Sequence, residues 1–306
     1  MTFKADFVGK RKYFIALSLV LILVSLVFIF TKGFNFGVDF TGGIEISVSV
    51  PDIDMTVAEI RELLSAEDPS FAAARIIKQR PLIEEGSSEQ RSRFSIIVNT
   101  SESDESVTSK ILAGLESEGV TESNILSVST ISGYAAQEIR GYAWIAVIVS
   151  MALLLLYITI RFKFSFGVGA IITLIHDVII VMGFYSIFGI EFNAPVVASL
   201  LTLVGYSLND TIVVYDRIRE NTKKMRGKTI ETVVNTSIND VIVRSINTSL
   251  TTFLAVLTLF IFSGEVLRPF AFGMLVGVIV GTYSSLYISS PVVIEWLKRV
   301  ENRKHA

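Results

Sequence analysis

Six apolar runs divide this 306-residue sequence, and a lipid bilayer is the environment that suits them. They cover residues 13–30, 141–160, 166–188, 192–215, 243–262 and 270–297. A membrane-spanning helix needs about 20 mostly apolar residues. The chain is 51% hydrophobic and only 18% charged, which is unlike an ordinary soluble domain. The sequence therefore predicts a polytopic α-helical membrane protein with six transmembrane helices.

The first run also has features of a cleavable signal peptide, because Lys10, Arg11 and Lys12 precede it. However, its apolar core of 18 residues is long for a signal peptide, and no small-residue cleavage site follows. We therefore expect a retained membrane anchor.

The positions of Lys and Arg predict the orientation, because cytoplasmic loops carry an excess of these residues. They form four clusters: Lys4 and Lys10–Lys12, Arg161 and Lys163, Arg217–Lys228, and Lys298–Lys304. All four fall on the same side of the six runs. We expect a cytoplasmic N-terminus (1–12), a first transmembrane helix (13–30), an external domain (31–140), transmembrane helices two to six (141–297) and a cytoplasmic tail (298–306).

The external segment has the pattern of a small α+β domain. Alternating apolar residues predict strands at 43–50, 73–79, 93–99 and 125–131, and helical spacing predicts helices at 56–66 and 104–118. A polar turn is expected at 84–91. The resulting order, β-α-β-β-α-β, is the ferredoxin-like pattern.

The sequence of the external segment contains no recognisable catalytic or ligand-binding motif. It contains no nucleophile elbow, phosphate loop or metal-ligand spacing. Its nine Lys/Arg against eighteen Asp/Glu argue against nucleic acid. The whole chain has no cysteine and only two histidines, His176 and His305. We expect no catalytic residues, no metal and no cofactor, and a surface that either contacts proteins or is simply solvated.

One acidic residue, Asp210, lies inside the fourth apolar run. An ionised carboxylate at the centre of a bilayer costs roughly 3 kcal/mol or more, so such residues usually move ions or protons. Ser199, Thr202 and Tyr206 precede it at spacings of three or four. We expect these four side chains to share a helix face that is directed at other helices or water.

Arg244 is the predicted partner of Asp210. The strictly apolar part of the fifth run is too short to cross a bilayer, so the helix must include polar residues upstream, among them Arg244, Thr248 and Thr251. The depths of Asp210 and Arg244 differ by roughly 6–8 Å at about 1.5 Å per residue. The pair is either a fixed salt bridge between helices or a carboxylate that gains and loses a proton as the arginine moves.

Further candidates lie in the third, fourth and sixth runs. His176 and Asp177 add a second titratable pair in the third run, which either conducts or only packs. Asn209 adds an amide beside Asp210. Gly273, Gly277 and Gly281 recur every four residues in the sixth run. Such a stripe of small residues lets another helix approach closely.

These residues occur in motifs that resemble the SecD/SecF family of protein-export membrane proteins, and within it the SecF branch. The resemblance covers nearly the whole chain. The motifs are Gly37–Gly43, Arg161-Phe162 with Phe166-Gly167, Leu174–Asp177, Glu191–Asn193, Gly205–Asn221, Arg244 with Thr248–Thr252, and Gly281–Ser285. Two departures are Asn247 and Ser263, and neither removes a titrating group.

The resemblance implies a membrane protein that forms one half of an RND-like arrangement, with SecD as the other half. It also implies association with the SecYEG channel, an indirect connection with the SecA motor, and a preprotein substrate at the external domain. In that family an ion gradient drives outward movement of preproteins, and the acid and arginine involved correspond to Asp210 and Arg244. A further acid is expected from SecD.

Three functional hypotheses remain open at this point. The first is a subunit that couples a proton or sodium gradient to protein export, since a carboxylate with neighbouring Thr and Asn serves either ion. The second is half of an RND-type small-molecule exporter. The third is a scaffold whose polar residues only hold the complex together.

Overall fold

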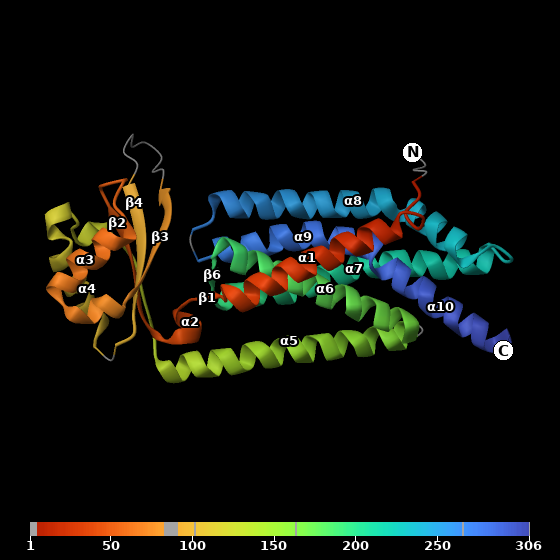
Figure 1. Ribbon diagram of the computed structural model, residues 1–306, viewed down its shortest axis with the longest axis horizontal. Coiled ribbons are helices and arrows are strands. Elements are labelled where there is room, and N and C mark those ends of the chain that lie inside the picture. Colours follow the sequence, from red (N-terminus) through yellow and green to blue (C-terminus); the bar gives the residue numbers. More distant parts are fainter. Residues whose placement is uncertain (1–4, 83–90, 101, 163, 265, 306) are drawn as a thin grey trace. The chain divides into compact units, whose positions relative to one another are not determined.

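The chain folds into two compact units in the computed structural model, which describes residues 5–82, 91–100, 102–162, 164–264 and 266–305. One unit is Phe36–Tyr142, and the other combines the residues up to Asn35 with those from Ala143 onward (Figure 1). The predicted turn at 84–91 lies outside the described residues except for Arg91.

Long apolar helices make up the second unit. Their bounds are α1 (Arg11–Thr31), α5 (Gly133–Arg161, which begins in the first unit), α6 (Phe164–Phe188), α7 (Ala194–Lys224), α8 (Ile230–Phe262), α9 (Arg268–Tyr287) and α10 (Ser289–His305). Six segments are long and apolar enough to cross a membrane, the last of them being Arg268–Trp296. This confirms the prediction of a polytopic helical membrane protein. The helices α6, α7 and α9 form the buried centre, whereas α1, α5 and α8 are mostly exposed.

Two helices extend well beyond the apolar runs that predicted them. Helix α7 continues to Lys224, nine residues past the end of the predicted run at residue 215. Helix α8 begins at Ile230, because the side chain of Thr229 accepts the Thr232 N–H and caps it. Both helices continue past their apolar parts as amphipathic segments.

The sixth run, 270–297, is two helices rather than one. Helix α9 ends at Tyr287, and α10 begins at Ser289. Pro291 has no backbone N–H, so the carbonyl of Tyr287 four residues earlier cannot be bonded in a regular helix. Arg268–Trp296 still counts as one candidate membrane span, and the break at Ile288 divides it into two helices.

Close contact between α7 and α9 organises the helical unit. A Cβ atom added at Gly273 would lie 2.6 Å from Ser199 Oγ, one at Gly277 would lie 2.6 Å from Leu203 Cδ1, and one at Gly281 would lie 3.2 Å from Ser207 Cβ. The three glycines of α9 therefore lie against every fourth residue of α7. This matches the geometry expected for small residues at a helix interface.

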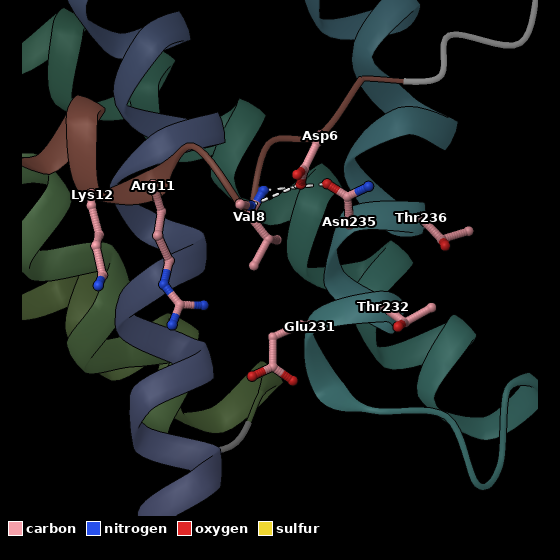
Figure 2. Close-up of a pocket in the computed structure, with 9 residues that line it drawn as sticks. Asp6, Val8, Arg11, Lys12, Glu231, Thr232, Asn235 and Thr236 are labelled. Atoms are coloured by element: carbon pink, nitrogen blue, oxygen red, sulfur yellow. Dashed lines mark hydrogen bonds between the residues drawn. The ribbon is translucent and has the colours of Figure 1, made fainter.

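The N-terminal segment is fixed to α8 by two asparagine side chains, and Figure 2 shows the first of them, Asn235. Asn235 Oδ1 accepts the N–H groups of Phe7 and Val8 at 2.8 and 3.3 Å, and Asn239 Oδ1 accepts that of Ala5 at 2.9 Å. Both amides also donate to the Ala5 carbonyl. A cavity beside this segment has a mixed lining that includes Asp6, Arg11, Lys12 and Glu231.

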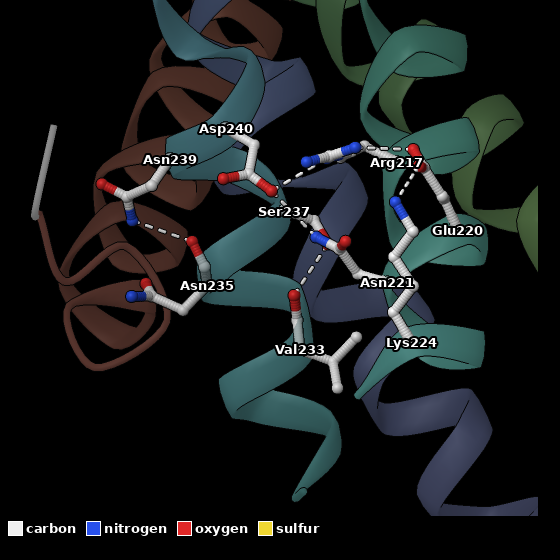
Figure 3. A network of polar contacts seen from close by, with 9 residues as sticks. All are labelled: Arg217, Glu220, Asn221, Lys224, Val233, Asn235, Ser237, Asn239 and Asp240. Carbon is white, nitrogen blue, oxygen red and sulfur yellow. Dashed lines mark hydrogen bonds and ion pairs between the residues drawn. The ribbon is translucent and has the colours of Figure 1, made fainter. Parts of the chain in front are cut away.

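A polar network joins α7 to α8 beyond their apolar parts (Figure 3). Arg217 donates to Asp240 at 2.8 Å and to Glu220 at 2.6 Å. Asn221 donates to Asp240 and to Ser237, both at 3.0 Å. These contacts set the rotation of α8 relative to α7 at one end of the pair.

The first unit is a four-stranded antiparallel sheet with two helices. Its elements are β2 (Gly43–Val50), α3 (Val57–Glu67), β3 (Arg75–Leu82), β4 (Arg91–Val98), α4 (Asp104–Gly114) and β5 (Ile125–Ile131), and the strand order is β3-β4-β2-β5. Short elements complete the chain: β1 (Asn35–Phe36), α2 (Val38–Thr41) and β6 (Glu191–Phe192), with 3₁₀ turns at Pro69–Ala73, Glu116–Glu118 and Glu122–Asn124. Alternate residues of β2 and β4, such as Ile46 and Ile96, are buried in one core with Ile60 and Ile111 of the helices.

An ion-paired lysine connects α4 to the end of α3. Lys110 Nζ lies 2.8 Å from both Asp68 Oδ2 and Glu102 Oε2. The Lys110 hydrogen bond, followed by the Ser70 N–H, lowers the pKa of Asp68 to about 2. A carboxyl group with a lowered folded-state pKa stabilises the fold above its unfolded pKa of about 3.9 and loses that contribution as the pH falls towards 2.

A first prediction concerns this lysine. Lys110→Met should destabilise the first unit at pH 7, and the difference from the wild type should shrink between about pH 4 and pH 2, where Asp68 becomes protonated. Hydrogen exchange of the β2 amides at several pH values measures this. Lys78→Met is the control, because Lys78 donates mainly to the carbonyls of Ile53 and Met55, which do not titrate. An equal pH profile for the two variants would contradict the account.

A second prediction concerns the α7–α9 contact. In Gly273→Ala the new methyl would lie 2.1 Å from the Tyr185 hydroxyl, which is held by a hydrogen bond to the Pro269 carbonyl at 2.7 Å. Overpacking of this kind costs about 1–3 kcal/mol. Thermal unfolding in detergent should show this loss. At Gly205 of α7 no described atom beyond the adjacent helix backbone lies within 4 Å of an added methyl, so Gly205→Ala should not be destabilising. A loss as large as that of Gly273→Ala would refute the steric explanation.

Candidate functional site

Asp210 lies at the meeting point of three helices. It is buried in α7, and its Oδ2 accepts a hydrogen bond from Ser249 Oγ of α8 at 3.3 Å. Thr282 Oγ1 of α9 in turn donates to Ser249 Oγ at 2.6 Å. The carboxyl group therefore ends a short chain of hydroxyl groups from α9 through α8 to α7.

Asp177 is a second buried carboxyl group with a fuller set of partners. Its side chain is 0% exposed. Ser207 Oγ of α7 and Ser284 Oγ of α9 donate to Oδ2 at 2.5 and 2.8 Å, and His176 Nδ1 lies 2.8 Å from Oδ1. The His176 ring is also buried, and its Nε2 has no hydrogen-bond partner in the described structure. Asp177 thus holds α6, α7 and α9 together.

The two carboxyl centres are linked through the same helices. Ser207 and Asp210 are three residues apart on α7, and Thr282 and Ser284 are two residues apart on α9. Residues three apart on a helix lie on neighbouring positions of one face. The Asp177 contacts therefore fix the part of α7 that carries Asp210.

The structure does not bring Arg244 into direct contact with Asp210. Arg244 is exposed on α8, and among the described residues no ion pair joins it to Asp210. Asn209 is also exposed. The transport roles of Asp210, Arg244, Asp177, His176 and Asn209 remain predictions.

The hydroxyl partners of the two acids were not predicted from the sequence. We expected Thr202 and Tyr206 beside Asp210, but Thr202 is exposed, and Ser207 lies on the buried face instead. Thr248 and Thr251, which the sequence places in the fifth span together with Arg244, donate to carbonyls of their own helix. Ser207 and Ser284 offered a usable sequence signal, because each is a hydroxyl residue within a predicted apolar run.

The described residues contain no group of three or more acidic or histidine side chains placed to hold a metal ion. Each centre instead offers one carboxyl group with hydroxyl groups around it. Such an arrangement can accept or release a proton, and its hydroxyl groups can relay it. Hydroxyl and carboxylate oxygens are also ligands for hard monovalent or divalent cations.

Known proteins match the chain over almost its full length. The family described as "Protein export membrane protein SecD/SecF, C-terminal" matches residues 112–299, and the "SecD/SecF GG Motif" matches residues 27–50. The chain belongs to the SecD/SecF family. The resemblance stated from the motifs is thereby confirmed.

Two relatives show which part of the family the chain corresponds to. It is 55% identical to the protein translocase subunit SecF of Petrotoga mobilis, over 98% of this chain and 99% of that one. It is 38% identical to the protein translocase subunit SecDF of Thermus thermophilus, over 96% of this chain but 39% of that one. The crystal structure of Thermus SecDF superposes with a TM-score of 0.85 at 37% identity, covering 96% of this chain and 39% of that one.

A third prediction tests the anchoring role of Asp177. Asp177→Ala removes the acceptor of two buried hydroxyl groups and of His176, and breaking a buried polar network of this kind costs about 3 kcal/mol or more. Thermal unfolding of the purified chain in detergent should show the loss. Asn209→Ala, an exposed polar residue of α7, should change stability by less than about 0.5 kcal/mol. Equal stabilities for the two variants would exclude the anchoring role.

Proposed function

We propose that this chain is the SecF subunit of a Sec protein translocase and that it couples an ion gradient to the outward movement of preproteins. Family membership and the full-length match to a SecF subunit support the pathway. Buried Asp210, hydrogen-bonded across three helices, is the observation that carries the coupling. An ionisable residue within a membrane span is a functional-site hypothesis by default.

The partner that this proposal requires is SecD. The Thermus relative is a single SecDF chain, and this chain corresponds to 39% of it, so the remaining part would be supplied here by a separate SecD subunit. Arg244, Asn209 and Thr202 are exposed on α7 and α8, although polar groups within a bilayer must face protein or water. A SecD helix with a carboxylate would cover this face and pair with Arg244.

The wider assembly follows from the same proposal. The Lys and Arg clusters favour cytoplasmic termini and an external location for residues 31–140. The element and strand order of the first unit favours a ferredoxin-like domain outside the membrane. SecYEG would lie beside the helical unit, SecA would act indirectly from the cytoplasmic side, and the preprotein would meet the external domain.

The coupling step uses the difference in how firmly the two acids are held. Among the described residues, Asp177 has three hydrogen-bond contacts, with Ser207, Ser284 and His176, whereas the Asp210 side chain has one, at 3.3 Å, from Ser249. Protonation of Asp210 would remove its attraction to Arg244 and let α8 shift. One proton crossing 100 mV releases about 2.3 kcal/mol, which is enough to change the populations of two conformations substantially.

A fourth prediction tests this coupling directly. Asp210→Asn should abolish the gradient-dependent part of export in inverted membrane vesicles, because the amide cannot carry a proton, while SecD still copurifies. The matched control is Asp216→Asn on the same helix, an exposed acid 3.8 Å from Arg161, which should retain export. Separate proton and sodium gradients would identify the ion.

Two outcomes would overturn the proposal. Full export by Asp210→Asn under a normal gradient would exclude this acid from coupling. If SecD is lost from the purified Asp210→Asn complex, and export is reduced only because of that loss, Asp210 holds the complex together and does not couple it to the gradient.

A further inference from the structure

Strand β5 forms an unprotected edge of the four-stranded sheet. Among the described residues it pairs only with β2, so one row of its backbone N–H and C=O groups has no strand beside it. Residues 126–130 are all exposed, and Leu126 and Val128 are 38% and 41% exposed. The strand sequence, ILSVSTI, contains no charged residue and no proline.

The opposite edge of the same sheet is built differently. Strand β3 has the sequence RIIKQRPL, with three cations and a proline. Lys78 of this strand folds over the adjacent loop and donates to the carbonyls of Ile53 and Met55 at 3.0 and 2.6 Å. Lysine and proline are the residues by which proteins keep edge strands from pairing with other chains. The sheet therefore has one edge strand, β3, that is protected against pairing with another chain, and one open edge, β5, that is not.

An open edge of this kind recognises extended polypeptide backbone. A peptide that adds as a further strand satisfies the free N–H and C=O groups of β5, and the binding energy comes mainly from main-chain hydrogen bonds. Along β5, Ser127 and Ser129 alternate with Leu126 and Val128. Small hydroxyl groups and modest apolar side chains select for no particular sequence.

We propose that β5 binds an extended segment of the exported polypeptide by strand addition, an inference that rests on the function proposed above. The seven residues of β5 offer a strand about 23 Å long. One added strand buries less than the roughly 1,200 Å² of a stable protein interface, so binding is transient, as a moving chain requires. The net acidic character of residues 31–140, with nine Lys/Arg against eighteen Asp/Glu, favours neutral or basic segments.

Cysteine cross-linking tests the geometry, because the natural chain contains no cysteine. Ser129→Cys would be placed in the intact complex with a stalled export substrate that carries a single cysteine at successive positions. Strand addition predicts disulfide yields that alternate with a period of two along the substrate, because successive strand residues face opposite sides. Ser117→Cys, an exposed serine on the turn Glu116–Glu118, should give low yields without alternation.

A charge placed on the edge provides the second measurement. Ser127→Lys should lower the affinity of the complex for a neutral or basic unfolded polypeptide by about fivefold to tenfold, which corresponds to roughly 1–1.4 kcal/mol. Ser117→Lys makes the same charge change away from the sheet edge, so it should leave the affinity unchanged. If Ser127→Lys and Ser117→Lys lower the affinity equally, the added charge alone explains the effect, and the proposal is overturned.

The remaining outcomes separate this inference from the proposed function. Uniform cross-linking along the substrate, or a cross-link from Ser129→Cys to SecD or to a second copy of the chain, would show that β5 does not bind substrate by strand addition. The effect of Asp210→Asn on export would be untouched by either result. If the alternating cross-links from β5 are found but Asp210→Asn does not change export, strand addition at β5 is supported and the proposed coupling through Asp210 is refuted.

Discussion

The hydrogen bond between a buried carboxyl group and hydroxyl groups of neighbouring helices is the interaction on which this membrane unit depends. A bilayer offers no water to an unpaired polar group, so each acid must find its donors within the protein. Asp177 takes donors from α7 and α9, and Asp210 takes one from α8, which is itself linked to α9. The two acids thus determine how four helices are rotated about their axes.

Close helix packing makes these short contacts possible. The glycines of α9 let it approach α7 until Gly281 lies against Ser207, the residue that donates to Asp177. At the far end of α7 and α8, the Arg217–Asp240 contact and the Asn221 amide hold the two helices in register. Asp210, with its contact at 3.3 Å to Ser249, therefore lies beside the more fully bonded Asp177, and α8, which donates that contact, is largely exposed along its apolar part.

Residue types predicted much of the architecture, but they did not predict how each helix is rotated about its own axis. Hydropathy identified the spans, and alternation identified the strands of the first unit, because both follow from local periodicity. The partners of Asp210 were missed because helix rotation is set by tertiary contacts: Ser249 points inward, whereas its neighbour Thr248 bonds to the carbonyl of Arg244. The break at Ile288 was missed because hydropathy does not register the N–H that Pro291 lacks.

The central proposal is that Asp210 gains and loses the coupling proton, beside an Asp177 carboxyl group whose hydrogen bonds hold α6, α7 and α9 together. Infrared difference spectroscopy of the membrane-reconstituted complex, recorded as the pH is varied, measures this most directly. The account predicts one protonated-carboxyl band that appears and disappears with pH, vanishes in Asp210→Asn and persists in Asp216→Asn. Other carboxyl groups of the complex titrate in every variant, so the same set of titrating bands in Asp210→Asn as in the wild type would contradict it.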